Sequence, residues 1–429
     1  MKSIFLSVFT CLMFFSTNVL AQEDEGNSGT VYSKYGTGFP LLNNTAQEKA
    51  MGIIGISFND LGSPGLSNPA FWGIGAFSKI AANFDFANYS VKDSFSNGSN
   101  SLLKIGSFQA VFPLSKNQLG LSIGLYPETR SSYNVNSEET VIQGGSNINF
   151  LSNRTGTGGV TKFEVGLGWK INQRISLGYA PSYSFLTESE DASLTFLNQN
   201  ISNNTVNRRI NGTSVSHRFG LLLSERGIFG KEDIIQIGGT LTLPTNFDAS
   251  QKKTTTKIVG TESEVVEIGT AQNADISLPL KMGAGISYFP NSKFNASVEF
   301  QTEKWSEAEY GFSSSDESAF VDRNVFGLGF QYHPYKDRSS KFLSNFKYSA
   351  GVSYDTGHIK VNNEEVETLW LSAGLGLISP NLRSNSSFDL SFQYGFRGTT
   401  SQNLVEERIF GINLSVNLTE LMFLRRKLN

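Results

Sequence analysis

Residues 162–171 read KFEVGLGWKI, and this stretch decides the fold because large and small side chains alternate along it. Every second residue from Phe163 to Ile171 is large and apolar, whereas the residues between them are Lys, Glu or Gly. A period of two places these sets on opposite faces of a strand. One apolar face and one small or polar face are typical of a barrel strand between lipid and a wet lumen.

The same alternation recurs along most of the chain. It is clear in residues 118–126, 234–243, 294–300, 325–332, 388–396 and 408–418. The strands that we expect are 77–90, 101–113, 117–128, 159–172, 174–187, 213–225, 233–245, 274–289, 293–305, 319–333, 341–355, 366–379, 386–397 and 405–418. A soluble sandwich also has alternating strands, but strands of soluble proteins average about 5–6 residues. Fourteen is even, as closure of a single-chain bacterial barrel requires. The sequence therefore predicts an all-β fold, a 14-stranded antiparallel transmembrane β-barrel.

The connections between the expected strands alternate in length. Short turns are expected at 114–116, 172–173, 227–232, 290–292, 334–340 and 380–385, and long loops at 129–158, 188–212 and 246–273. Short turns of such barrels face the periplasm and long loops face outward. Both ends of the barrel are therefore expected on the periplasmic side.

The first 21 residues have the pattern of an export signal. Lys2 precedes an apolar run that is too short to cross a bilayer, and Val19-Leu20-Ala21 suits signal peptidase. Cys11 is the only cysteine, so the mature chain has no thiol. We expect a signal peptide at 1–21, a hatch at 22–76 and the barrel at 77–429, exported through the periplasm to the outer membrane.

Residues 49–73, KAMGIIGISFNDLGSPGLSNPAFWG, follow neither helical nor strand periodicity. A surface segment of turns is one interpretation. Because a barrel follows directly, the lumen is the other. We favour a hatch in the lumen, and its most compact run is Asn68, Pro69, Ala70, Phe71 and Trp72.

The composition favours neither an enzyme nor a nucleic-acid binder. The formal net charge of −3 argues against a nucleic-acid partner. The three histidines are scattered, and neither a nucleophile elbow nor a phosphate-binding glycine loop is present, so we expect no catalytic site, no cofactor and no bound metal. Acidic runs at 188–191 and 262–267 are expected in outer loops, either as solvated charge or holding cations that bridge lipopolysaccharide.

Several of these residues resemble the FadL family of outer-membrane transporters for long-chain fatty acids and other hydrophobic compounds. Its hatch carries an Asn-Pro-Ala like that of residues 68–70. The remaining similarities are Ala50-Met51-Gly52, Leu278-Pro279, Trp305-Ser306, residues 370–374 and residues 388–395. The family's aromatic-Arg-x-Gly is Tyr348-Ser349-Ala350-Gly351 here, and the last strand lacks a terminal aromatic residue.

The resemblance implies passive uptake of hydrophobic compounds such as fatty acids, with hatch movement and lateral exit into the membrane through a break in the third strand. Pro127 lies there, where it marks either a break or the strand's end. Lys347, Arg218 and Lys281 are candidate cations for a ligand carboxylate, although each also suits an ion pair with an inward acid such as Glu164, Glu299 or Asp389.

A second hypothesis also follows from the resemblance. Some FadL-like barrels do not transport, and instead serve as subunits of outer-membrane secretion or assembly complexes. The partners expected are therefore hydrophobic small molecules, outer-membrane lipid and lipopolysaccharide, or partner outer-membrane proteins. A blocked lumen would favour the second hypothesis.

Overall fold

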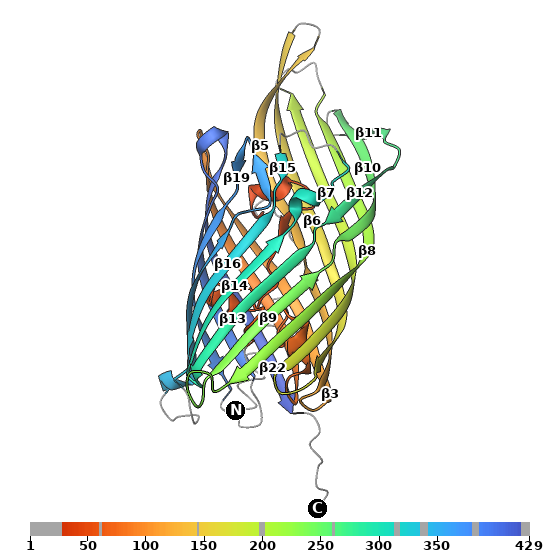
Figure 1. Cartoon of the computed structure of the whole chain (residues 1–429). Helices are drawn as coiled ribbons and strands as arrows, with labels where there is room; N and C mark the ends of the chain where they lie inside the picture. The colour runs from red at the N-terminus through yellow and green to blue at the C-terminus, as the bar shows by residue number, and fades with distance from the viewer. Residues whose placement is uncertain are drawn as a thin grey trace, which may run out of the picture.

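The computed structural model describes residues 28–59, 62–143, 146–196, 202–259, 262–312, 318–334, 342–379 and 386–421. These residues form a closed, antiparallel, 14-stranded barrel, as the alternation predicts (Figure 1). Its wall strands are β2 (Phe77–Lys92), β3 (Asn97–Ser115), β4 with β5 (Leu119–Pro127, Thr129–Gln143), β6 (Ser146–Lys170), β7 (Ile175–Phe196), β8 (Asn204–Arg226), β9 with β10 (Ile234–Thr242, Thr245–Val259), β12 with β13 (Gln272–Leu278, Lys281–Asn291), β14 (Phe294–Glu303), β16 (Arg323–Tyr332), β17 (Phe346–Asp355), β20 (Thr368–Ile378), β21 (Ser387–Arg397) and β22 (Glu406–Leu421).

The barrel closes where the first wall strand pairs with the last. The β2–β22 register runs from Phe77↔Leu421 to Lys92↔Glu406. Outward-facing residues such as Phe163, Leu167 and Trp169 are each more than 40% exposed, so they form an apolar outer belt for lipid. Among the described residues, no helix has the length and hydropathy needed to span a membrane.

The segments predicted as long outer loops are instead extended strands. Most of 129–158 belongs to β5 and β6, and 188–212 largely continues β7 and β8. Residues 246–273 largely form β10, β11 (Glu262–Ile268) and the start of β12. Above the belt both faces of a hairpin are wet, so the apolar half of the alternation disappears although strand pairing continues. Figure 1 shows these hairpins rising above the barrel, and we call that end the outer end.

The N-terminal segment lies inside the barrel (Figure 1). Its elements are η1 (Val31–Lys34), β1 (Phe39–Pro40), α2 (Ala46–Ala50) and η2 (Pro69–Gly73). The segment descends from η1 at the outer end to Gly75, whose carbonyl accepts from Asn117 N–H (2.9 Å) at a short turn. The remaining short elements are η3 (Trp305–Glu307), β15 (Ser318–Phe320), η4 (Phe342–Asn345), β18 (Ile359–Val361), β19 (Glu364–Glu365) and η5 (Ser401–Asn403). The predicted signal peptide (1–21) and the C-terminal run 422–429 lie outside the described residues.

Candidate functional site

The Asn-Pro-Ala run begins a short 3-10 helix that the barrel wall encloses. Asn68 Oδ1 caps the helix by accepting from Ala70 N–H (3.0 Å), and Pro69 takes the first helical position, where no N–H is needed. The Asn68 amide also donates to the carbonyls of Ile56 (2.7 Å) and Leu221 (3.1 Å). One side chain therefore ties the helix to the upstream segment and to β8.

Glycines on the inner wall make room for this helix. A Cβ built at Gly178 would overlap the backbone of Pro69, and one at Gly220 would overlap the Asn68 amide. On β4, a Cβ at Gly120 would overlap the Trp72 carbonyl oxygen, whereas one at Gly124 would have its nearest neighbour 3.7 Å away. The alternating glycines thus let backbone pack directly against backbone at the periplasmic end.

Glu299 of β14 holds the middle of the N-terminal segment. Its carboxylate accepts from the N–H groups of Ile54 (2.8 Å), Gly55 (2.7 Å) and Ser57 (2.7 Å), and from the Ser57 hydroxyl (2.9 Å). Glu299 is 2% exposed. The sequence interpretation made it a partner for a cation, whereas the structure uses its charge to bind peptide N–H groups.

The three candidate cations all face inward and each pairs with an acid. Lys347 lies 2.9 Å from Asp389 and both are buried. Lys281 bonds to Glu128 and lies 3.7 Å from Glu303.

Arg218 lies 2.5 Å from Glu164 and also donates to the Ser67 carbonyl (3.1 Å). It therefore joins the wall to the residue that precedes the Asn-Pro-Ala run.

The third wall strand changes course at Pro127. β4 ends there, and its last pairing with β3 is Phe108↔Leu125. β5 begins at Thr129 and pairs with β6, while on its other side Thr129 and Arg130 pair with β1 inside the lumen. Among the described residues, β3 and β5 share no ladder above Phe108, and we call this break in the strand pairing the side gap. Gly29 of the N-terminal segment lies in it, where its N–H donates to the Ser132 carbonyl of β5 (2.9 Å).

Glu128, at this change of course, anchors the bend to the opposite wall. Its carboxylate bonds to Lys281 of β13 and lies 3.5 Å from Lys162 of β6. Lys281 continues to Glu303, which accepts from Arg323 (3.0 Å) and from the Trp305 indole (2.6 Å).

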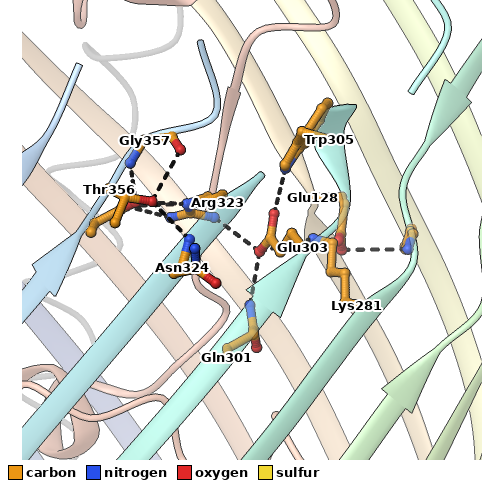
Figure 2. A network of polar contacts seen from close by, with 11 residues as sticks. Glu128, Lys281, Gln301, Glu303, Trp305, Arg323, Asn324, Thr356 and Gly357 are labelled. Atoms are coloured by element: carbon orange, nitrogen blue, oxygen red, sulfur yellow. Dashed lines mark hydrogen bonds and ion pairs between the residues drawn. The ribbon is translucent and has the colours of Figure 1, made fainter. Parts of the chain in front are cut away.

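Arg323 in turn binds Asp355 at 2.7 Å through Nη2 and 3.0 Å through Nε. Figure 2 shows most of this network, which crosses the lumen. Sequence reasoning missed Glu128, Glu303 and Arg323, because their partners lie on strands far apart in the chain.

Packed apolar side chains close the outer end of the lumen. Tyr32, Phe39, Ile359, Val366 and Leu404 form one buried cluster. His358 is fully buried beside them, with its ring 5.2 Å from that of Phe39 and 5.0 Å from that of Trp305. Burial lowers the pKa of His358 to about 3, so the ring is neutral at physiological pH.

A cavity of about 190 Å³ remains between this cap and residues 40–53 of the N-terminal segment. Leu42, Ile53 and Trp370 are among its apolar lining residues, and Arg130 and Arg397 are among its charged ones. The lining also includes Leu102 of β3, beside the side gap, and Gly29, which lies in it. This cavity is therefore a modest chamber beside the side gap.

The acidic runs lie on strands rather than in loops. Glu190 of β7 pairs with Arg208 of β8 at 3.1 Å, and Asp191 accepts from Asn207 at 2.7 Å. Within the described part of the chain, no group of three or more His, Cys, Asp or Glu side chains is placed to hold a metal ion.

The sequence profile of a family described as BamG matches residues 1–429. Solved structures with a similar fold include the Pseudomonas putida toluene transporter TodX, with 14% identity and a TM-score of 0.58 over 90% of this chain and 100% of that one. A Pseudomonas aeruginosa FadL homologue has 11% identity and a TM-score of 0.59, covering 89% and 99%. The Ralstonia pickettii toluene transporter TbuX has 13% identity and a TM-score of 0.58, covering 89% and 99%.

These likenesses establish the FadL-type barrel fold that the sequence predicted. No curated protein sequence matches the chain.

Proposed function

The chain belongs to the BamG family, and from its filled lumen we propose that it is a non-transporting barrel subunit of an outer-membrane secretion or assembly complex. The observation that carries the proposal is the lumen itself. The N-terminal segment packs against glycines below, and the cap around Tyr32 and Ile359 closes the outer end.

The cavity below the cap is small for a transport path. Pockets that bury drug-sized ligands measure about 300–1,000 Å³, whereas this cavity measures about 190 Å³. The inward cations Lys347, Arg218 and Lys281 already pair with acids, so a ligand carboxylate would have to displace a buried partner. A subunit that acts through its outer surface requires neither an open path through the lumen nor a cationic side chain that is available to a ligand.

Purification from the native outer membrane tests the proposal. The tagged full chain would be extracted in mild detergent and its native mass measured. We expect a defined complex in which one or more outer-membrane proteins are stoichiometric with the barrel. A chain recovered only as a monomer, at every detergent concentration that keeps the barrel folded, would contradict the proposal.

The side gap favours a second candidate function, passive uptake of hydrophobic compounds with hatch movement and lateral exit. The cavity lies beside the side gap, and two of the similar structures, TodX and TbuX, are toluene transporters. A cavity of about 150 Å³ holds benzene, so this chamber suits a small aromatic compound better than a long acyl chain. For a sixteen-carbon acid, lateral exit avoids exposing methylenes to water at about 0.8 kcal/mol each, roughly 10 kcal/mol in all.

Pro127→Val separates the two functions. Valine supplies the N–H that proline lacks and favours a continuous third strand, which would narrow the gap. If the chain is an uptake channel, radiolabelled toluene or palmitate should enter cells that carry the variant more slowly than cells that carry the wild type at equal surface levels. The subunit proposal predicts that wild type and variant take up either compound no faster than cells without the protein.

A further inference from the structure

Within the described part of the chain, one edge of β3 has no strand paired with it at the outer end. Residues 97–107 of β3 pair with β2, from Lys92↔Asn97 to Asn83↔Ser107. On the other side, the β3–β4 ladder begins only at Phe108↔Leu125. Among the described residues, the second side of 97–107 therefore has no ladder.

A groove of about 570 Å³ lies at the outer end of this edge, along residues 97–100. Asn97, Gly98 and Ser99 of β3 line it, with Val135 and Asn136 of β5 across from them. Its floor includes Tyr32 and Leu404 of the outer cap. The groove is therefore bounded by two strands of the wall and is closed underneath.

This edge of β3 carries few of the features that prevent the edge strands of other proteins from pairing with a second chain. Native edges are commonly blocked by proline, by several charges or by short length. Residues 97–107 read NGSNSLLKIGS, eleven residues with no proline and one charge, Lys104. Leu103 is 49% exposed and Ile105 67% exposed, so the lower part of this edge lies in the apolar belt. Backbone groups without partners are costly there, because lipid offers no hydrogen bonds.

We propose that the groove between β3 and β5 receives an extended segment of a partner outer-membrane protein, which adds to the β3 edge as an antiparallel strand. This inference rests on the proposed function and states where the partner binds. The ligand class follows from the groove: an uncovered row of backbone groups is complementary to another backbone, and alternate side chains of the incoming strand would face the groove floor.

Site-specific photocrosslinking tests the placement. A benzoylphenylalanine at Ser99 lies in the groove, and one at Ser90 is the matched control. Ser90 is opposite Ser99 in the ladder, but its strand is paired on both sides, with β3 and with β22. We expect Ser99 in intact cells to crosslink to one short segment of the protein that co-purifies with the barrel, at least about fivefold more than Ser90. Crosslinks to lipopolysaccharide, to lipid or to a second copy of this chain would overturn the inference, as would equal yields.

A pair of tryptophan variants tests the same placement without a crosslinker. A Cβ at Gly98 or at Gly230 meets no atom within 4 Å, so both positions accept a side chain without disturbing the fold. Gly98 lies in the groove, whereas Gly230 lies in the turn between β8 and β9. We expect Gly98→Trp to reduce the co-purified partner about tenfold and Gly230→Trp to leave it unchanged, with both barrels still heat-modifiable.

If a stoichiometric partner is retained by Gly98→Trp, the inference is wrong while the proposed function stands. If no partner co-purifies even with the wild-type chain, both are wrong.

Discussion

The periplasmic and outer halves of the lumen are filled in different ways. In the periplasmic half, η2 lies against wall glycines such as Gly178 and Gly220, and backbone contacts backbone. In the outer half, the strand bend at Glu128 and the cap are joined by buried ion pairs through Lys281 and Arg323. Steric fit fixes one arrangement, whereas an ion-pair network depends on every partner being present. The outer half is therefore the part that a single charge change disturbs most.

Removing the centre of the network should have the largest effect. Arg323→Met leaves Asp355 buried without its ion-pair partner and leaves Glu303 with only Lys281 at 3.7 Å, and breaking a buried pair in this way costs about 3–5 kcal/mol. We expect the cap to open, so that a protease added at the outer end cleaves the N-terminal segment, which is protected in the wild type. The control is Arg174→Met, because Arg174 is 73% exposed in its pair with Glu225 and such pairs contribute at most about 1 kcal/mol. Equal protease sensitivity of the two variants would contradict this prediction.

Adding a methyl group to one of the wall glycines that contact η2 should have the next largest effect. Gly120→Ala places a Cβ on the Trp72 carbonyl, and overpacking of this kind costs about 1–3 kcal/mol. We expect a cysteine at Ser67 to be labelled from the periplasm roughly tenfold faster in this background. Gly124→Ala, on the same strand and the same face, has a 3.7 Å clearance and should leave labelling unchanged. If both variants are labelled at the same rate, steric fit against the wall glycines does not hold η2 in place.

Loss of the Glu299 charge should loosen the middle of the segment by less. Glu299→Gln keeps the size but turns one acceptor into a donor, facing N–H groups such as those of Ile54 and Gly55. Hydrogen bonds to charged groups contribute about 1.5–3 kcal/mol, and part of this remains with the amide oxygen. We expect a few-fold faster hydrogen exchange confined to residues 54–57. Unchanged exchange there would show that the carboxylate does not hold the segment.

Acid should open the cap through His358. Its pKa is lowered to about 3 by burial, from an ordinary 6.5. The unfolded chain therefore binds more protons between these values, and the stability due to neutral His358 is present above pH 6.5 and lost as pH falls toward 3. A cysteine at Ile359 should become labelled as pH falls from 7 to 4. His358→Phe, which cannot titrate, should remove most of that change; an identical pH profile would exclude His358 as the cause.

Much of the fold could be predicted because lipid imposes a strict pattern on the chain. The alternation in residues 162–171 and its repeats identified the fourteen wall strands. The hairpins beyond the belt were mistaken for loops, because neither face of β7 or β8 needs apolar residues there.

Less of the site could be predicted. The inward direction of Lys281 and Glu299 follows from the alternation, but their partners depend on which strands face each other across the lumen. Glu128 and Lys281 are 153 residues apart, and no local pattern joins them. The expected placement of Asn68 in the lumen rested on the barrel that follows it and on the resemblance, since the stretch around it has no periodicity.

A disulfide between the N-terminal segment and the wall tests the central claim, that the barrel acts through a partner and not by moving its hatch. The hydroxyl oxygens of Ser57 and Ser287 are 2.8 Å apart, so Ser57→Cys with Ser287→Cys places two thiols within bonding reach in a mature chain that has no other. The measurement is the amount of stoichiometric partner complex, together with uptake of radiolabelled toluene and palmitate, before and after reduction. We predict that the oxidised variant forms the complex as well as the wild type does and that reduction changes neither quantity. Uptake that is abolished by oxidation and restored by reduction, from a barrel without a partner, would contradict the account.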